Sequence, residues 1–322
     1  MTDAPMSVEP GSDMPGPFDT TLVELAPAKV NLSLVVRGRR RDGYHELVSL
    51  VAFAIDVCDT VSLCPGAVGP TKVAVSDLPR SEVEGLLADN LVDRAVAAVA
   101  AVTPEARLGQ FCIEKRIPLA AGLGGGSADA AAALRALAKL NGIADVDARF
   151  HELATRLGAD VPVCIGDPLP RAAMMGGIGE RLWRQPPGEA FLPGGLAAVL
   201  VNPRQGVPTG AVFRELAASP FEEDASAARG ELARPAYPSI ASLMAALAGA
   251  PNDLEAPALR IAPVIGEVLA AIAALPGCRL ARMSGSGATC FGLFDDLAVA
   301  RLAADALAVA QPHWWVRPSR LV

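Results

Sequence analysis

Residues 118–129 read PLAAGLGGGSAD, and the interpretation of the whole chain starts from this stretch. Four of its five central positions are glycine, directly after a predicted strand at 110–117. Gly costs conformational entropy wherever it is used, so we expect a ligand or a tight turn to require it here. The alanine-rich run at 127–140 is predicted to be a helix, with Ser127 as its N-cap and Asn141-Gly142 as its stop.

The position of the glycines suits a phosphate site. A helix N-terminus presents unpaired N–H groups and a partial positive charge, and glycines before it let the backbone approach an anion. The stretch is not a Walker A motif, because no Gly-Lys-Ser/Thr follows, and Ser127 stands where a G-x-G-x-x-G motif needs its last glycine. Taken alone, it is also open to a second interpretation, a glycine-rich connection to a capped helix that binds nothing.

The composition excludes several classes of protein. The chain has 322 residues, 52% of them hydrophobic, which suffices for two domains or one large one. Its net charge of −7 argues against broad binding of nucleic acids or membrane surfaces, which need clustered Lys and Arg. No apolar run is long enough to cross a bilayer, and the N-terminal residues lack the regions of a secretory signal. A local basic site for a phosphate-bearing metabolite stays open.

The cysteines indicate a compartment. The six of them form no CxxC pair and have no metal-ligand spacing with the three histidines. Most lie in apolar, strand-like runs, so we expect buried free thiols in a reducing environment. The predicted location is the cytoplasm.

The order of predicted elements indicates an α+β fold. Residues 1–20 are rich in Pro, Gly, Ser and Asp and are predicted to be a disordered tail. The following run, TLVELAPAKVNLSLVV, is expected to form two short strands or one strand with a bulge at Pro27. A Pro/Gly-rich interval near 185–195 predicts a boundary between domains 21–186 and 187–322. Helices are further expected at 90–103, 146–157, 208–217, 238–249, 263–275 and 296–310, and strands within 45–63 and at 194–203, 278–283 and 288–294.

Three segments together resemble the motifs of the GHMP kinases, which include galactokinase, homoserine kinase and mevalonate kinase. PLAAGLGGGSADAA (118–131) is similar to their phosphate-binding motif, and ARMSGSGATCFGLF (281–294) to their C-terminal motif. APAKVNLSLVVRGRRRDGYHEL (26–47) resembles the N-terminal motif of one branch, the 4-diphosphocytidyl-2-C-methyl-D-erythritol kinases of the non-mevalonate isoprenoid pathway. The order of that family is also followed by DNLVDRA, LGADVPV, GGIGE, QGVPTGAVF and PNDLE, so the resemblance covers about 22 to 320.

The resemblance implies a two-domain GHMP kinase fold. The N-terminal domain, ribosomal-protein-S5-domain-2-like, would carry the ATP loop, and the C-terminal domain would be ferredoxin-like. Mg-ATP would phosphorylate the 2-hydroxyl of a small-molecule substrate, 4-diphosphocytidyl-2-C-methyl-D-erythritol, in the cleft between them. The chain departs from the family at Ala128, where a second serine is usual, and at Met174-Met175, where a small and a charged residue are frequent. Neither departure removes a catalytic group.

Two residues are implied to be catalytic, Lys29 and Asp160. Asp160 would accept or orient the substrate hydroxyl, since phosphoryl transfer needs positioning and charge neutralisation. Its residue type alone also fits a turn-capping Asp, which is the commoner role. Lys29 lies in an apolar strand-like run, where a lysine either reaches the surface or meets a carboxylate. The resemblance pairs it with Asp160, whose ionised form an ammonium group would favour.

The resemblance also implies the binding residues. Tyr44 and Phe213 would sandwich the cytosine ring, His45 would contact its edge, Thr209 would contact the methylerythritol part, and Asn31 would hydrogen-bond the polyol. From the residues alone, Phe213 could instead be a core residue of a helix and Tyr44 a packing residue of a turn. The ATP site would comprise Pro118, Ala120, Ala121, Gly122, Leu123, Gly124, Gly125, Gly126 and Ser127, with Asn90, Leu91 and Lys115 near the adenosine and Ser127 as a contact for Mg²⁺.

Two other functions stay open at this point. Another GHMP kinase, acting on homoserine or mevalonate, would not need Tyr44, His45 and Phe213 around a base. A catalytically inactive nucleotide-binding regulator could lose Lys29 or Asp160, yet both are present.

Overall fold

The structure, a computed structural model, describes residues 20–75, 90–143, 148–166, 169–184, 192, 194–221, 237 and 239–322. The predicted tail, apart from its last residue, and most of the predicted boundary at 185–195 lie outside these residues. In the part of the chain that is described, no helix is both long and apolar enough to cross a membrane.

One long strand organises the N-terminal half. β3 (His45–Pro65) pairs antiparallel with β1 (Leu22–Asn31), with one register shift between Pro27 and Ala28. The unpaired residues at this shift, 55–57, lie in β3, which bulges opposite Pro27, while β1 continues as a single strand. The other strands of this half pair with β3 or with one of its neighbours: β2 (Val35–Arg39), β4 (Lys72–Val75), β5 (Gly109–Lys115), β6 (Ala173–Gly177) and β7 (Arg181–Arg184).

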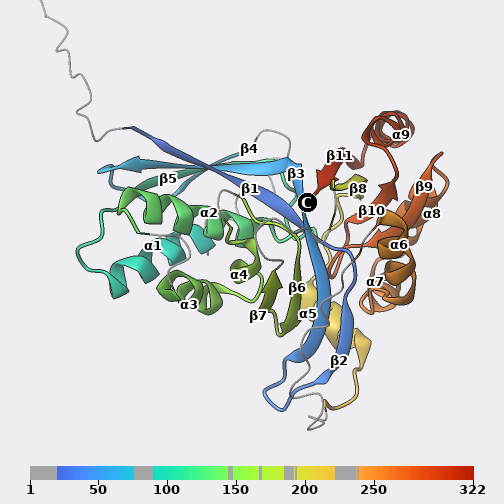
Figure 1. Cartoon of the computed structure of the whole chain (residues 1–322), viewed down its shortest axis with the longest axis horizontal. Helices are drawn as coiled ribbons and strands as arrows, with labels where there is room; N and C mark the ends of the chain where they lie inside the picture. Colours follow the sequence, from blue (N-terminus) through green and yellow to red (C-terminus); the bar gives the residue numbers. More distant parts are fainter. Residues whose placement is uncertain are drawn as a thin grey trace, which may run out of the picture.

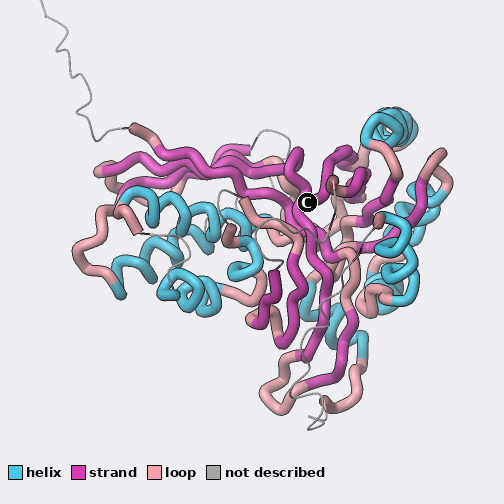
Figure 2. The backbone as a smooth tube through the Cα atoms, viewed as in Figure 1, coloured by secondary structure: helices cyan, strands magenta, loops and turns pink. Residues whose placement is uncertain are grey.

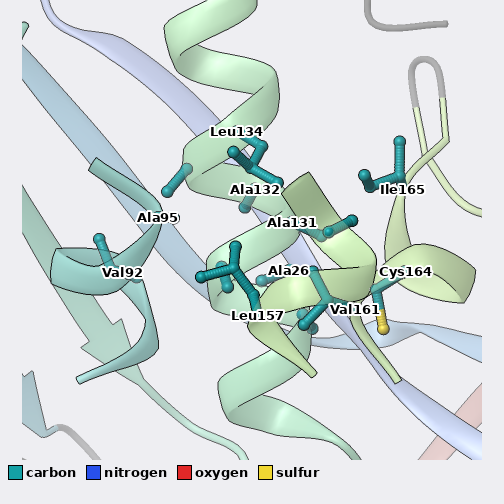
Figure 3. Close-up of a cluster of buried hydrophobic side chains, with 14 of the residues drawn as sticks. Ala26, Val92, Ala95, Ala131, Ala132, Leu134, Leu157, Val161, Cys164 and Ile165 are labelled. Carbon is teal, nitrogen blue, oxygen red and sulfur yellow. The ribbon is translucent and has the colours of Figure 1, made fainter. Parts of the chain in front are cut away.

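A group of helices covers one face of these strands (Figure 1 and Figure 2). The central one is α2 (Gly125–Leu140), of which residues 128–138 are all buried. Its small alanine side chains allow close packing on every side. Figure 3 shows Ala131 and Ala132 of α2 among side chains of its neighbours, including Val92 and Leu157. These neighbouring helices are α1 (Leu91–Val102), α3 (Ala148–Leu157) and α4 (Val161–Cys164).

The start of α2 corrects the prediction. The helix begins at Gly125, and its N-cap is Gly124 in the left-handed conformation (φ 62), so Ser127 is the third helical residue and not the cap. Gly adopts this φ without a steric cost, which allows the helix to start before the serine. The predicted end is confirmed, since Asn141 is the C-cap and Gly142 has a φ of 63.

The C-terminal half contains a ferredoxin-like unit. β8 (Leu196–Asn202), β9 (Cys278–Met283), β10 (Cys290–Phe294) and β11 (Trp315–Leu321) form an antiparallel sheet in the order β11-β8-β10-β9. With α8 (Val264–Ala273) before β9 and α9 (Leu297–Ala310) before β11, the chain follows the β-α-β-β-α-β order of that fold. The remaining helices of this half are α5 (Thr209–Leu216), α6 (Ile240–Gly249) and α7 (Glu255–Ile261).

The two faces of this sheet pack against different helices. Val199 and Val201 of β8 lie in a cluster with α7, α8 and α9, whereas Ala198 and Leu200 face a cluster that includes α6 and β1. This alternation is the period of two expected for a strand buried on both sides.

β11 joins the two halves into one sheet. It pairs with β8 along its length and with β3 at Leu321, opposite Ala54. This strand was not predicted from the sequence, and its Pro318 is unusual for a central strand. The proline is tolerated because it is paired on one side only, with Val199 of β8. The pairing of β11 with β3 lies further along the strand, at Leu321.

The thiols are free, as predicted. None of the six cysteines, all of which are described, forms a disulfide. Only Cys164 and Cys290 are fully buried, and the other four are partly exposed, so the expectation of buried thiols is correct for these two alone.

Candidate active site

A cavity of about 1010 Å³ lies where the two halves meet. The strand end of β1, the β2–β3 turn, the glycine stretch, the residues before α4, the start of α5 and the turn at 284–289 all contribute to its wall. It is lined by Lys29, Asn31, Tyr44, His45, Leu91, Lys115, Pro118, Ala120, Ala121, Gly122, Gly124, Gly125, Gly126, Ser127, Asp160, Thr209 and Phe213, all predicted site residues.

Two predicted residues do not line the cavity. Leu123 is buried, and its carbonyl accepts a hydrogen bond of 2.8 Å from the backbone N–H of Lys29. Asn90 is the N-cap of α1, and its side chain accepts from the N–H of Val92 at 2.9 Å. Both residues therefore hold neighbouring parts of the wall in place, Leu123 through the glycine stretch and Asn90 through the helix that presents Leu91.

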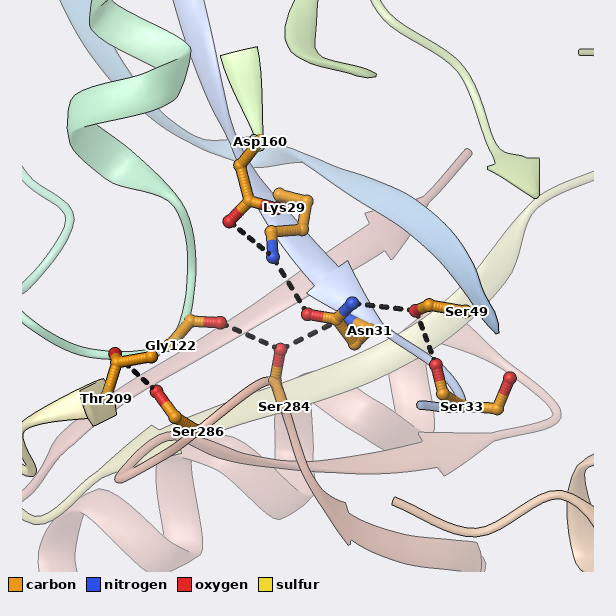
Figure 4. A network of polar contacts seen from close by, with 9 residues as sticks. All are labelled: Lys29, Asn31, Ser33, Ser49, Gly122, Asp160, Thr209, Ser284 and Ser286. Carbon is orange, nitrogen blue, oxygen red and sulfur yellow. Dashed lines mark hydrogen bonds and ion pairs between the residues drawn. The ribbon is translucent and has the colours of Figure 1, made fainter. Parts of the chain in front are cut away.

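Lys29 and Asp160 come together at the centre of the site (Figure 4). The Nζ of Lys29 lies 3.1 Å from Oδ2 of Asp160, with the lysine 5% exposed and the aspartate 33%. Asp160 is at the N-cap position of α4, but its side chain makes no capping hydrogen bond. The turn-capping role that its residue type allowed is therefore not the one observed, and the carboxylate is turned toward the lysine.

Asn31 orients the lysine. Its Oδ1 accepts from Nζ of Lys29 at 2.9 Å, and its Nδ2 donates to Oγ of Ser49 at 2.7 Å (Figure 4). Ser49 donates in turn to the carbonyl of Ser33 at 2.5 Å. Because these groups are buried and hydrogen-bonded in series, the ammonium group of Lys29 is held in one place.

The glycine stretch is fitted closely against the turn at 284–289. The Oγ of Ser284 donates to the carbonyl of Gly122 at 3.1 Å, and the N–H of Thr289 donates to the carbonyl of Ala121 at 3.1 Å. A methyl group on Gly122 would lie 2.4 Å from the carbonyl oxygen of Ser284, so no larger residue fits. The glycine stretch and the turn at 284–289, which lie in two separate motifs, are therefore in contact. The first N–H groups of α2, at Gly125 and Gly126, lie at the cavity wall, where a helix start attracts anions.

Lys115 is ion-paired with two aspartates that were not identified from the sequence. It is 2% exposed, and its Nζ contacts Oδ2 of Asp59 and lies 2.6 Å from Oδ2 of Asp129 in α2. Asp59 also accepts from the N–H groups of Arg116 and Ile117, at 2.6 and 2.9 Å. Lys115 thus ties β3, β5 and α2 together directly behind Gly125.

The pKa values of Asp129 and Lys115 are both shifted upward. Burial raises the pKa of Asp129 to about 7; Lys115 opposes the shift and the charge of Asp59 adds to it. Burial alone would lower the pKa of Lys115, but the two carboxylates outweigh it and raise that pKa. The second oxygen of Asp129 is buried and has no hydrogen-bond partner among the described residues. A carboxylate with one unpartnered oxygen is costly to ionise.

The three residues predicted to bind the base, Tyr44, His45 and Phe213, all line the cavity, and two of them are in direct contact. The rings of His45 and Phe213 stack with centroids 4.8 Å apart and planes at 28°. Burial and, less strongly, the charge of Arg39 lower the pKa of His45, which favours the neutral imidazole. Tyr44 is 60% exposed at the cavity mouth.

Thr209 begins α5, and its hydroxyl hydrogen-bonds Oγ of Ser286 at 2.8 Å (Figure 4). This contact links α5 to the turn at 284–289.

Several residues of the site were not identified from the sequence: Asp59, Asp129, Ser284 and Ser286, and two cavity arginines, Arg39 and Arg214. Ser284 and Ser286 lie within a quoted motif and could have been named from it, whereas Asp59 carries no local signal.

The predicted contact for Mg²⁺, Ser127, lines the cavity. Among the described residues there is no group of three His, Cys, Asp or Glu side chains that could hold a metal ion. Mg²⁺ commonly keeps several waters and binds through substrate phosphates with few protein ligands. Ser127, whose hydroxyl is not used as a cap, lines the cavity and can provide one such ligand.

Two family models match the segments of the chain that form this site. The GHMP kinases N terminal domain matches residues 90–167, and the GHMP kinases C terminal matches residues 228–311. The first match contains the glycine stretch and Asp160, and the second contains the turn at 284–289. Fold and site therefore define a kinase of the GHMP class.

Proteins similar to this chain over most of its length identify the family within this class. A 4-diphosphocytidyl-2-C-methyl-D-erythritol kinase of Rhodopseudomonas palustris is 49% identical over 306 residues, which are 94% of this chain and 98% of that protein. One of Methylobacterium radiotolerans is 52% identical over 303 residues, 94% and 99% of the two chains. A crystal structure of 4-(cytidine 5'-diphospho)-2C-methyl-D-erythritol kinase has a TM-score of 0.68 at 37% identity and covers 93% of this chain and 99% of that one. The chain belongs to the 4-diphosphocytidyl-2-C-methyl-D-erythritol kinase family.

Membership of this family confirms the resemblance, the predicted fold class and the predicted enzyme class, a small-molecule kinase with ATP as a substrate. The domain boundary at 186/187 stays a prediction, and the two matched family segments lie on either side of it.

Proposed function

We propose that this cavity binds ATP and 4-diphosphocytidyl-2-C-methyl-D-erythritol together, and that the γ-phosphoryl group of ATP is transferred to the 2-hydroxyl of the acceptor. The observation that carries the proposal is the Lys29–Asp160 pair, 3.1 Å apart, in a cavity that the glycine stretch and the His45–Phe213 pair also line. Each requirement of phosphoryl transfer to an alcohol has a residue there.

The glycine stretch would hold the donor. Backbone N–H groups at the start of α2, with the positive end of the helix dipole, favour the β- and γ-phosphates. Mg²⁺, with Ser127 as a protein contact, would neutralise charge on the phosphate oxygens. Lys115 lies directly behind Gly125, so in our proposal it fixes the shape of the phosphate site and does not contact the adenosine.

Lys29 and Asp160 would prepare the acceptor. The carboxylate of Asp160 is one-third exposed at the cavity, so it can accept a hydrogen bond from the 2-hydroxyl and orient it toward the γ-phosphorus. Lys29 keeps Asp160 ionised and places a positive charge beside the transferring group. Asn31 holds Lys29 and is near enough to the cavity to contact the polyol as well.

Tyr44, His45 and Phe213 would select the cytosine base. In our proposal the ring stacks on Phe213, with Tyr44 closing the other side and neutral His45 at its edge. A neutral imidazole offers one donor and one acceptor, which suits a base edge that presents both. Thr209, beside Ser286, would lie near the methylerythritol part. A cavity lined by both the base-binding rings and the Lys29–Asp160 pair favours this substrate over homoserine or mevalonate.

The proposal also covers the cellular compartment of the enzyme and its partners. The six free thiols favour a reducing compartment, and we place the enzyme in the cytoplasm. Its partners would be small molecules, with no nucleic acid or membrane involved.

The proposal is tested by product analysis. Purified full-length chain with Mg²⁺ and ATP should convert 4-diphosphocytidyl-2-C-methyl-D-erythritol to a product with a new phosphomonoester, followed by ³¹P NMR, while homoserine and mevalonate are not phosphorylated. Cytidine should compete with the acceptor and not with ATP. Phosphorylation of either alternative alcohol in preference to the cytidine substrate would refute the assignment.

A further inference from the structure

The charged side chains that line the cavity are not all paired. The residues concerned are Lys29, Arg39, His45, Lys115, Asp160 and Arg214. Lys29 is paired with Asp160, and Lys115 with two buried carboxylates behind the wall. Arg39 and Arg214 have no ion-pair partner among the described residues, and both line the cavity.

Both arginines lie beside the stacked rings. Arg39 is the last residue of β2 and is directly opposite His45 in the β2–β3 register. Arg214 follows Phe213 in α5, and its Nη1 lies 3.5 Å from where a methyl group on Gly210 would be. The guanidinium group of Arg214 is thus folded back toward the start of α5, on the cavity wall, and not extended away from it.

The charge of these residues matches one part of the proposed acceptor. Its diphosphate links the nucleoside to the polyol and carries two negative charges at neutral pH. With the base at His45 and Phe213 and the hydroxyl at Asp160, this linker has to lie within the cavity that Arg39 and Arg214 also line. The glycine stretch and Lys29 are already assigned to the donor and the reacting hydroxyl, and the two arginines are the lining cations left.

We propose that Arg39 and Arg214 bind the diphosphate of the acceptor, one from β2 and one from α5, and so make the site specific for a nucleoside diphosphate derivative over a nucleoside. This inference rests on the proposed function and adds to it the residues that recognise the linker. Arginine suits the role because its planar guanidinium group can donate two parallel hydrogen bonds to a phosphate.

The test compares two ligands that differ only in the diphosphate. Binding of cytidine and of CDP to the full chain is measured by calorimetry with a saturating non-hydrolysable ATP analogue and Mg²⁺, so that CDP cannot occupy the donor site. Wild type should bind CDP at least about tenfold more tightly than cytidine, the effect of one charge-assisted contact. Arg39→Gln and Arg214→Gln should each remove about tenfold from the affinity for CDP and leave that for cytidine within about twofold.

Two variants sharpen the comparison. Arg214→Lys keeps the charge but not the paired donors, so it should recover part of the CDP affinity. Arg301→Gln removes an exposed arginine of α9 that does not line the cavity, and it should change neither affinity.

The outcomes separate the two proposals. Equal losses for cytidine and CDP in the arginine variants would show that they support the stacked rings and do not bind the diphosphate, and unchanged CDP affinity would also refute the inference. In either case wild-type turnover of the acceptor leaves the proposed function intact. If wild type neither phosphorylates the acceptor nor binds cytidine or CDP, the proposed function fails, and this inference fails with it.

Discussion

Gly124 lies directly against Lys29. A methyl group placed on Gly124 would be 3.1 Å from Cε of the lysine and 4.0 Å from Oδ2 of Asp160. Gly124 is the N-cap of α2 and has a φ of 62. The start of α2 and the lysine that we propose prepares the acceptor are therefore in contact, and a change in one displaces the other.

This contact predicts different results for two Gly→Ala substitutions. Gly124→Ala and Gly142→Ala both place alanine at a left-handed φ, 62 and 63, at the two ends of α2. Each should lower the free energy of unfolding by about 1 to 2 kcal/mol in denaturant titrations. Gly142 has nothing within 4 Å of an added methyl group, so Gly142→Ala should keep its turnover number. Gly124→Ala should lose at least about tenfold, as expected for a misplaced catalytic group. Equal turnover in the two variants would contradict the coupling.

Phe213 should determine acceptor affinity and leave donor affinity unchanged. Phe213→Leu removes the ring but keeps an apolar side chain in the cluster around α5. If the ring stacks on cytosine, the KM for the acceptor should rise by about 5- to 140-fold, from the 1–3 kcal/mol of a stacked base. Phe213→Tyr, which keeps the ring, is the matched control and should stay near wild type. Steady-state kinetics with each substrate varied in turn decide the matter, and a parallel rise in the KM for ATP would argue for general damage to the site.

His45 should titrate below the ordinary histidine pKa of 6.5. Burial is the larger cause and Arg39 the smaller, so Arg39→Gln should raise the pKa of His45 only part of the way back. The sign follows from the lowered pKa: the neutral form persists to a lower pH than in an ordinary histidine, and its contribution to acceptor binding is lost only as the pH falls through that value. NMR titration of the three histidines measures the shift. Arg301→Gln, with the same change in net charge, should leave the pKa of His45 unmoved.

Asp129 should make stability fall as pH rises. Its pKa is raised from 3.8 to about 7, so the folded chain binds a proton that the unfolded chain releases across this range. The associated stability is complete below pH 3.8 and is lost as the pH rises toward 7. Relative to Asp129→Asn, which cannot ionise, the wild type should become progressively less stable between pH 4 and 7 in urea titrations. A constant difference between the two proteins over this interval would mean that Asp129 is ionised throughout.

The sequence predicted the parts of the site whose chemistry is local. Lys29, Asp160 and the glycine stretch lie in short motifs that resemble those of a known family, and the alternation over β1 is a local signal that the structure confirms. The alternation and turn residues depend on neighbours in the chain, which a sequence displays directly.

Long-range partners could not be predicted in this way. Asp59 meets Lys115 across a sheet, and Arg39 meets His45 only because a hairpin sets their register. The predicted start of α2, at Ser127, was wrong by two residues. Gly124, and not the serine with the better capping side chain, has the backbone conformation that begins the helix. β11 was missed because its partners, β3 and β8, are distant in the chain.

The most direct test of the proposed mechanism is a single-turnover measurement on Asp160→Asn and Lys29→Met, with enzyme in excess over the acceptor and saturating Mg-ATP. Both side chains keep nearly the native volume, and the rate of phosphoryl transfer should fall by about 10²- to 10⁴-fold in each, while ATP affinity, measured separately, changes little. Lys139→Met, which removes a lysine of α2 outside the cavity, should react at the wild-type rate. Undiminished transfer by folded Asp160→Asn would contradict the central claim that this carboxylate, held beside Lys29, prepares the hydroxyl for attack.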